Sequence, residues 1–273
     1  MTPHPNLISE SMLISETVSL LRSFGGRASA VSIVDFVMRI RRPDPNLAKM
    51  LVADLIDRDP RLTLNGDTVE LAEAAFDERD LADVDYVVFD LETTGSKSPP
   101  GRIIEIGAYR VAGGALAGEF HSLINPEMAI PPFITGLTRI NDAMVSNAPV
   151  FADVANDLLE FIGDSVLVAH NSGFDMRFLN HEIGRIYPEM RIANPCLCTV
   201  QLSRRLVPET ANHKLKTVAD FYNIDLTNHH RASADAFATA HIFLNLLTRL
   251  HDGGVTGLGQ VRRMSSRKNR YVR

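Results

Sequence analysis

The sequence contains no tryptophan and only two cysteines, Cys196 and Cys198, among its 273 residues. Two thiols separated by a single residue are poorly placed for a disulfide, because their side chains diverge along an extended chain. Two cysteines alone also cannot complete a four-ligand zinc site. We therefore expect reduced thiols in or near a hydrophobic core, as is usual in a cytoplasmic protein.

Long apolar runs and a recognisable leader are also missing. No stretch approaches the ~18 consecutive apolar residues that a membrane-spanning helix needs. Residues 1–6 have neither the basic nor the apolar segment of a secretory signal. We therefore expect a cytoplasmic location and no membrane partner. Apolar residues still make up 45% of the chain, which is enough for a sizeable core.

The net charge says little about a partner. The formal charge is −5, which does not attract nucleic acid to the molecule as a whole. Residues 251–273 nevertheless form a basic C-terminal tail, whose cations near the end are Arg262, Arg263, Arg267, Lys268, Arg270 and Arg273. Such a tail could contact phosphate, but a solvated, disordered end explains the composition equally well.

Residues 1–80 have the pattern of a small α+β domain. Apolar spacing predicts three helices within residues 13–24, 31–40 and 47–56; Gly25-Gly26 would end the first, and Asn46 would cap the third. Alternating runs on either side of Asn65-Gly66 predict a hairpin. Three helices followed by a hairpin resemble a winged-helix domain, in which the third helix and the hairpin commonly contact DNA. The third helix here carries acids as well as bases, so DNA contact, protein docking and a structural role all stay open.

Residues 84–250 alternate between strand and helix patterns. Strands are expected at residues 86–89, 103–111, 119–124, 166–169 and 197–200, with Gly113-Gly114 as a turn between the second and third. Helices are expected at residues 151–162, 174–186, 216–222 and 233–250. This alternation predicts an α/β domain. A short charged connector at residues 77–83 separates it from the N-terminal part.

Two carboxylates stand at the end of the first strand expected in this domain, within Phe89-Asp90-Leu91-Glu92-Thr93-Thr94-Gly95. Residues i and i+2 of a strand lie on one face, so Asp90 and Glu92 should lie side by side. Like charges raise each other's pKa, and divalent cations relieve that cost. Carboxylate oxygens suit Mg²⁺ and Mn²⁺. Taken alone, Asp-x-Glu is also explained by two solvated acids at a strand end.

A second acidic segment, His170-Asn171-Ser172-Gly173-Phe174-Asp175, follows the fourth expected strand. Asp175 would lie in the first turn of a helix, where Gly173 would permit a close approach of the backbone. An aspartate at this position also has a simpler explanation, since negative charge complements a helix N-terminus.

The third segment is His229-His230-Arg231-Ala232-Ser233-Ala234-Asp235. Asp235 would lie near the start of the last long helix, with His230 on the loop that leads into it. A histidine there can accept a proton near neutral pH. A surface histidine pair beside a helix is the alternative.

In this order and with these spacings, the three segments resemble the motifs of the DEDDh, or DnaQ-like, 3′→5′ exonuclease superfamily. That superfamily includes the DNA polymerase III epsilon subunit and its stand-alone or UvrC-fused relatives. The residues that carry the motifs are Asp90 and Glu92, then His170, Asn171, Phe174 and Asp175, then His230 and Asp235. The stretch Ile134–Ile140 also looks like the family's connection to the middle motif. The resemblance covers residues 84–250, and UvrC fusions continue into a nuclease module for which this chain is too short.

The resemblance implies an RNase H-like fold, with a mixed five-stranded sheet flanked by helices. It implies that Asp90, Glu92, Asp175 and Asp235 hold two divalent cations, Mg²⁺ or Mn²⁺, roughly 3.5–4 Å apart. His230 would take a proton from the attacking water, and a nucleoside 5′-monophosphate would leave. The substrate would be bound by Thr93, Thr94, Gly95, Leu137, Thr138, His170, Asn171 and Phe174. For Leu137 and Phe174, ordinary core packing is the alternative.

The expected substrate is the single-stranded or frayed 3′ end of DNA, in proofreading or repair, with a DNA polymerase or a repair complex as a possible partner. Trimming of RNA 3′ ends is the alternative within the superfamily, because the motifs do not separate DNA from RNA. A different class of function is a DNA- or partner-binding module in which the nuclease activity is subordinate.

Overall fold

The computed structural model describes residues 4–57, 59–71, 76–227 and 229–266. The chain forms two compact units. The first contains residues up to 75 together with residues 183–193, and the second contains residues 76–182 and 194–273. Residues 183–193 therefore lie in the first unit although the resemblance to the exonucleases runs through them. This crossing is not part of the domain boundaries expected from the sequence.

The first unit combines three helices with a three-stranded antiparallel sheet of order β2-β4-β3. Its elements are α1 (Met12–Ser23), β2 (Arg27–Ser29), α2 (Ala30–Phe36), α3 (Pro45–Ile56), β3 (Leu62–Asn65) and β4 (Thr68–Leu71). Buried aliphatic side chains from the helices and strands, among them Leu21, Ile33, Val52 and Val69, form its core. The three helices and the final hairpin were expected, and the resemblance of this unit to a winged-helix domain stays a prediction. A separate pair, β1 (Leu7–Ser9) and β9 (Met190–Ile192), is antiparallel.

Two local expectations for this unit are corrected by the structure. The N-cap of α3 is Asp44 and not Asn46, because the Asp44 carboxylate accepts hydrogen bonds of 3.0 Å from the amides of Asn46 and Leu47. The hairpin turn lies one residue further along than expected. Asn65 pairs with Thr68, so Gly66 begins the turn, with the positive φ of 67° that glycine tolerates.

The second unit is built on a mixed five-stranded sheet of order β10-β8-β5-β6-β7, as the resemblance implied. The strands are β5 (Tyr86–Thr93), β6 (Ile103–Ala112), β7 (Ala115–Leu123), β8 (Val166–Ala169) and β10 (Cys196–Cys198). β5, β6 and β7 are antiparallel neighbours, whereas β8 runs parallel to β5 and to β10. The expected turn joins β6 to β7, with Gly113 and Gly114 at φ 57° and 78°.

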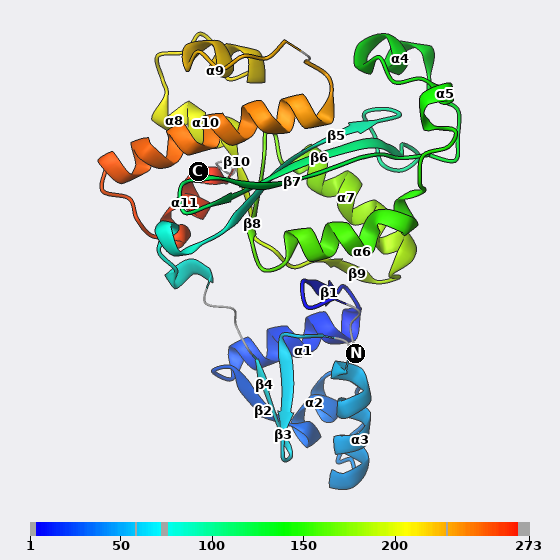
Figure 1. The fold of residues 1–273 in the computed structure, drawn as a ribbon. Coiled ribbons are helices and arrows are strands. Elements are labelled where there is room, and N and C mark those ends of the chain that lie inside the picture. The colour runs from blue at the N-terminus through cyan, green and yellow to red at the C-terminus, as the bar shows by residue number, and fades with distance from the viewer. Residues whose placement is uncertain (1–3, 58, 72–75, 228, 267–273) are drawn as a thin grey trace, which may run out of the picture. The chain divides into compact units, whose positions relative to one another are not determined.

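Helices cover both faces of this sheet (Figure 1). α10 (Ala232–Asp252) crosses one face over β5 and β6, while α6 (Phe151–Ile162) and α7 (Gly173–Ile186) lie on the other. The remaining elements are α4 (Pro132–Thr138), α5 (Asp142–Val145), α8 (Thr199–Leu206), α9 (Leu215–Phe221), α11 (Leu258–Ser265) and the short η1 (Phe76–Glu78) and η2 (Leu81–Asp83). None of the helices described here is both long and apolar enough to cross a membrane.

Two expectations for the second unit are also corrected. The strand expected at residues 197–200 ends at Cys198, and α8 begins at Thr199. The segment expected as a basic tail contains α11, whose Leu258 and Val261 are buried in the core of the unit. Residues 267–273, with the other tail cations, lie outside the described residues.

The alternation of side chains along β5 places the site. Tyr86 and Val88 face α10, and the Tyr86 ring packs edge-on against Phe243 with 4.9 Å between ring centroids. Asp90 and Glu92 continue the same face with a period of two. The apolar contact between β5 and α10 therefore gives way to carboxylates beside the first turn of α10.

Candidate active site

Acidic side chains from three elements converge at the end of β5. Asp90 and Glu92, from β5, and Asp235, from the first turn of α10, each place one carboxylate oxygen within 4.8 Å of those of the other two. Asp175, in the first turn of α7, is buried and is held by a hydrogen bond from the backbone of Leu91. Its charge acts on both Asp90 and Glu92. The structure thus brings together the four acids that the three sequence segments singled out.

Burial and mutual repulsion disfavour the ionised form of this cluster. Burial, followed by the charges of Asp175 and Asp235, raises the pKa of Asp90 well above its usual range. Burial and the charge of Asp235 raise the pKa of Glu92 to about 8, and burial raises the pKa of Asp175 to about 7. The acids cannot all be ionised near neutral pH without compensation. Divalent cations with hard oxygen ligands provide that compensation, so the donor set fits them.

Two neighbouring histidines contact Asp235 in different ways. The ring of His229 meets Asp235 directly, with Nδ1 at 2.8 and 3.1 Å from the two carboxylate oxygens. His230 donates its backbone amide to Asp235 at 3.2 Å, and its ring stacks on His229 with centroids 3.8 Å apart. Burial, followed by the charge of His229, lowers the pKa of His230. The contact made by His229 was not anticipated, because the motif pattern singles out only the second histidine.

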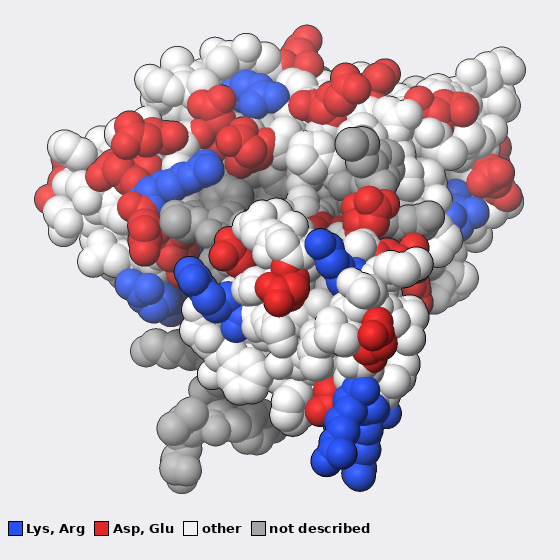
Figure 2. All heavy atoms as spheres, turned by 90° about the horizontal axis from the view of Figure 1, so that it is seen from below, with Lys and Arg blue, Asp and Glu red and all other residues white. Residues whose placement is uncertain are grey.

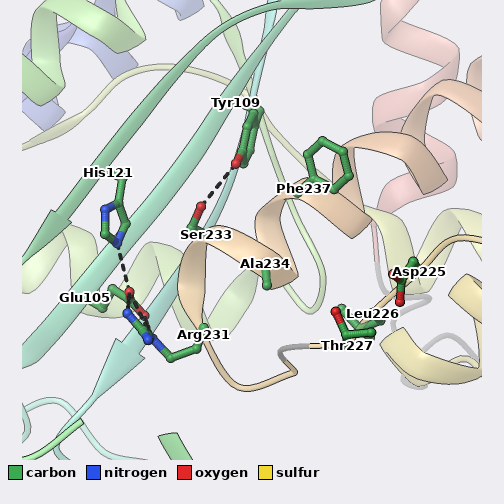
Figure 3. A pocket seen from close by; sticks show the side chains of 10 residues that line it. All are labelled: Glu105, Tyr109, His121, Asp225, Leu226, Thr227, Arg231, Ser233, Ala234 and Phe237. Atoms are coloured by element: carbon green, nitrogen blue, oxygen red, sulfur yellow. Dashed lines mark hydrogen bonds and ion pairs between the residues drawn. The ribbon is translucent and has the colours of Figure 1, made fainter. Parts of the chain in front are cut away.

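A buried ion pair beside the cluster was also missed (Figure 3). Glu105 of β6 lies directly across the sheet from Glu92, and it binds Arg231, the N-cap residue of α10. A glutamate inside the apolar run Ile103–Val111 was the available signal, since a buried charge needs a partner.

His170 is turned toward the protein interior. Its Nε2 lies 3.1 Å from the His213 carbonyl oxygen, which can only accept, so Nε2 carries the proton. Its Nδ1 lies 3.0 Å from the Thr199 hydroxyl. Burial, the largest cause, lowers the pKa of His170 to about 4. Both ring nitrogens are engaged, and these bonds fix the loop that carries Asn171.

Thr93 is the last residue of β5, and Thr94 and Gly95 begin the turn that follows it. The Thr93 hydroxyl donates to the Gly95 carbonyl at 2.7 Å, and the Thr94 hydroxyl accepts from the Arg102 amide at 2.9 Å. Both threonine side chains are largely buried. Their hydroxyls shape the turn, which leaves the backbone and the adjoining surface as the part that a ligand can reach.

The remaining expected binding residues differ in exposure. Leu137 on α4 is 39% exposed, so it is not an ordinary core residue, whereas Thr138 is buried and its hydroxyl bonds to the Ile134 carbonyl. Phe174 is half-buried and packs on Phe178 with 4.9 Å between centroids.

Polar cavities adjoin the loop between β8 and α7. One, of about 400 Å³, is lined by Asn171, Ser172, Gly173, Phe174, Arg177, Cys198, Gln201 and Ser265. A second, of about 370 Å³, shares Ser172 and Ser265 and adds Arg262 and Arg263 of α11. No described part of the protein approaches the Gly173 backbone closely, because a Cβ there would meet open space, so the close approach expected at Gly173 stays a prediction for a ligand.

Residues 87–243, which contain all of the acidic cluster, match the model of the exonuclease family RNase_T. The chain belongs to this exonuclease family. The match confirms the resemblance read from the three motifs, and it leaves residues 1–86 and α11 outside the shared region. The family assignment and the sheet order together establish the DnaQ-like, RNase H-like fold of the second unit.

Similarity extends to proteins that contain such a domain as one part. The chain is 39% identical over 188 residues to the PolC-type DNA polymerase III of Bacillus subtilis. This alignment covers 69% of this chain and 13% of the polymerase. It is 41% identical over 197 residues to a Mycobacterium tuberculosis protein named for a bifunctional exonuclease/endonuclease, covering 68% of this chain and 30% of that protein. The chain thus spans less than a third of the length of either relative.

A solved structure of Exonuclease X in complex with 5′ overhanging duplex DNA has the same fold. The TM-score is 0.54 with 26% identity, and the alignment covers 66% of this chain and 99% of Exonuclease X. That enzyme corresponds in extent to the exonuclease domain alone.

Proposed function

We propose that this exonuclease-family member is a metal-dependent 3′→5′ exonuclease that shortens DNA from single-stranded or frayed 3′ ends and releases nucleoside 5′-monophosphates. One observation carries the proposal. Asp90, Glu92 and Asp235 lie together with Asp175 beside them; burial raises the pKa of all four, and repulsion raises it further for Asp90 and Glu92. Such a cluster is stable in ionised form only beside strong positive charge.

The chain's residues divide into ligands and a proton acceptor. Asp90, Glu92, Asp175 and Asp235 would hold two divalent cations, Mg²⁺ or Mn²⁺. Bound there, these cations would make a water molecule more acidic and stabilise the leaving 3′ oxygen. His230 would accept the proton of the attacking water, since its lowered pKa keeps the ring neutral near pH 7.

The strand would lie across the end of the sheet. The turn Thr93–Gly95 and the exposed Leu137 would receive the terminal nucleotide, with Thr138 buried behind Leu137. Asn171 and Phe174 would contact the next unit, on the loop that His170 holds in place. An apolar surface for the base suits single strands, because every base can stack.

The cations that could bind the rest of the strand lie near the loop between β8 and α7. On the face seen in Figure 2, Lys and Arg side chains are interspersed with Asp and Glu over most of the surface. Arg177, Arg262 and Arg263, which line the cavities beside Ser172, are therefore the proposed contacts for phosphates further along the strand. Arg262 is also paired with Asp77.

DNA is favoured over RNA by two of the similar proteins. One is named as a DNA polymerase, of which this chain matches a part, and Exonuclease X was solved with DNA. A DNA polymerase or a repair complex, in the cytoplasm, is accordingly the proposed setting.

The test is a panel of 5′-labelled single-stranded, duplex and mismatched oligomers, each as DNA and as RNA, with Mg²⁺, Mn²⁺ or EDTA. Stepwise shortening from the 3′ end of DNA is expected with either cation and none with EDTA. Asp90→Asn should abolish it while the circular dichroism spectrum is retained. Full activity in EDTA would contradict the metal-dependent mechanism. Faster cleavage of RNA than of DNA would show that RNA is the preferred substrate.

The first unit is proposed to contribute to DNA binding. On α3, Met50 is 71% exposed and Leu47 is 47% exposed, and Arg41 and Arg42 precede the helix as exposed cations. If α3 contacts DNA, the non-cleaving Asp90→Asn protein should bind single strands more weakly once Arg41 and Arg42 are replaced by Ala. Unchanged binding, read by fluorescence anisotropy, would leave this unit for protein docking or for structure alone.

A further inference from the structure

Glu105 is a fully buried carboxylate next to the acidic cluster. It lies on β6 directly opposite Glu92 in the β5–β6 register, and its exposure is 0%. A buried charge without partners is strongly disfavoured. The charge of Glu105 must therefore be compensated by nearby groups, and these groups indicate its role.

All the acceptor positions of Glu105 are occupied by protein donors. Arg231 donates from Nη2 at 2.7 Å and from Nε at 3.1 Å, and the Ala232 amide donates at 2.8 Å. His121 Nε2 lies 2.8 Å away on the solvent side. Burial alone would raise the pKa of Glu105, but the hydrogen bonds from Arg231, His121 and Ala232 lower it, so the carboxylate is ionised. With its oxygens engaged in this way, Glu105 is not a further ligand for the cations.

The partners of Glu105 begin α10. Arg231 is the N-cap residue and Ala232 is the first residue of the helix, so the bonds from β6 fall between His230 and Asp235. Figure 3 shows the Arg231 side chain reaching from the start of the helix to the Glu105 carboxylate on the strand. Both active-site residues of this segment are thus within four residues of an anchored backbone position.

Two more residues of the same face of β6 hold the same turn. The Tyr109 hydroxyl lies 3.1 Å from the Ser233 hydroxyl. At Gly107 the two backbones are so close that a Cβ would lie 2.4 Å from the Ala232 carbonyl carbon and from the Ser233 nitrogen. Positions 105, 107 and 109 alternate onto one face of the strand. That face is therefore shaped to receive the first turn of α10.

We propose that Glu105, through Arg231 and the Ala232 amide, is a positioning residue for the reaction: it fixes the segment from His230 to Asp235 against the sheet, so that the proton acceptor and the α10 carboxylate keep their places relative to Asp90 and Glu92. The inference rests on the proposed exonuclease function. A misplacement of about 1 Å in such a site can cost on the order of 100-fold in rate.

The first variant is Glu105→Gln, which keeps the shape of the side chain and removes its charge. In full-length protein with Mn²⁺ and a DNA oligomer, kcat should fall by about 10- to 100-fold, with KM changed by less than about threefold. Hydrogen exchange of the amides from His229 to Ala236 should become faster in the cation-free protein, a readout that does not depend on turnover.

The decisive variant is the double replacement Glu105→Gln with Arg231→Gln. Glu105→Gln leaves the guanidinium of Arg231, whose side chain is 32% exposed, without its carboxylate partner, whereas removing both charges does not, so the double variant should regain whatever thermal stability Glu105→Gln loses. If Glu105 acts by positioning, kcat stays low although the melting temperature recovers. Recovery of kcat together with stability would show a role in folding only, and would overturn the proposal.

Tyr109→Phe is the matched control, because it removes a different hydrogen bond between β6 and the same turn without leaving a charge. Its kcat should fall by less than about threefold. An equal loss in Tyr109→Phe and Glu105→Gln would contradict a special role for the ion pair. Wild-type protein in the same assay separates the two hypotheses. An inactive wild type would contradict the exonuclease function. An active wild type with a fully active Glu105→Gln would contradict only the positioning role.

Discussion

The adjacent residues His229 and His230 make different contacts, so their replacement should affect activity differently. The His229 ring lies against Asp235, whereas His230 offers the cluster a backbone amide and stacks its ring on His229. His230 also has a positive φ of 66°, which a non-glycine residue adopts only when its surroundings hold it there. The two side chains can therefore be separated by substitution.

His230→Ala should lower kcat by roughly 10²- to 10⁴-fold, because a positioned base contributes about that much. In the wild type, activity should fall toward acid pH as His230 becomes protonated. Burial and His229 lower its pKa from the usual 6.5, so the midpoint of that fall should lie below 6.5. The measurement is kcat against pH with saturating Mn²⁺.

His229→Gln is the comparison for this prediction. Its effect on kcat should be smaller, and the acid limb should remain. Binding of Mn²⁺, followed by calorimetry, should be nearly unchanged in His230→Ala. If His230→Ala lost the cation, or if only His229→Gln removed the acid limb, the role of proton acceptor would belong elsewhere.

At the residue scale, the sequence was informative where a side chain's role follows from its own neighbours in the chain. The i, i+2 spacing alone places Asp90 and Glu92 on one face of a strand. Glu105 could not be assigned in this way. Its function depends on the register that sets it opposite Glu92 and on the approach of α10, which begins 127 residues later in the chain.

Between elements, β6 approaches the first turn of α10 closely at Gly107. Gly107→Ala should force these backbones apart, since the new Cβ would lie within 2.5 Å of Ala232. We expect a loss of about 1–3 kcal/mol in the free energy of unfolding. Activity should fall as well, because the shift separates Asp235 from β5.

Gly118→Ala on the neighbouring strand β7 provides the control. A Cβ there would meet only the Phe161 ring, at an ordinary 3.8 Å. Its unfolding free energy and its activity should stay near those of the wild type. If denaturant unfolding gave the same small change in unfolding free energy for Gly107→Ala and Gly118→Ala, the close approach of β6 to α10 would not matter for stability.

Elements with a long periodic pattern were predicted well, whereas the three-residue strands β1 and β9 were missed. Residues 151–162 were expected as a helix with the bounds that α6 has, because its apolar face repeats over three turns. β1 and β9 have three residues each, too few for any alternation to be detected. They are strands because each satisfies the other's backbone, a reason that the local sequence does not contain.

For the molecule as a whole, the acidic cluster links stability to pH. The pKa of Glu92 is raised to about 8 and that of Asp175 to about 7 in the folded state, from 4.5 and 3.8. A raised pKa favours the protonated native form, so this contribution to stability is complete below the unfolded values and is lost as pH rises through 7 and 8. The cation-free protein should therefore melt at a lower temperature at pH 8 than at pH 5.5.

Added Mn²⁺ should reverse this trend, because the cations bind the ionised carboxylates of the folded chain. The rise in melting temperature on adding Mn²⁺ should be larger at pH 8 than at pH 5.5, measured by calorimetry. Asp90→Asn, with one charge fewer, should show a weaker pH dependence in EDTA. Equal stabilisation by Mn²⁺ at both pH values would speak against the carboxylates as its ligands.

The pairing of β1 with β9 bears on how such proteins can be recombined. Residues 7–9 belong to the start of the chain, yet their strand partner is residues 190–192, downstream of the second acidic motif. A gene segment that begins at residue 76 would encode every residue of the acidic cluster but would leave one edge of β9 with unsatisfied amides. Grafting this nuclease onto another polypeptide thus requires either bringing residues 7–9 along or rewriting residues 183–193.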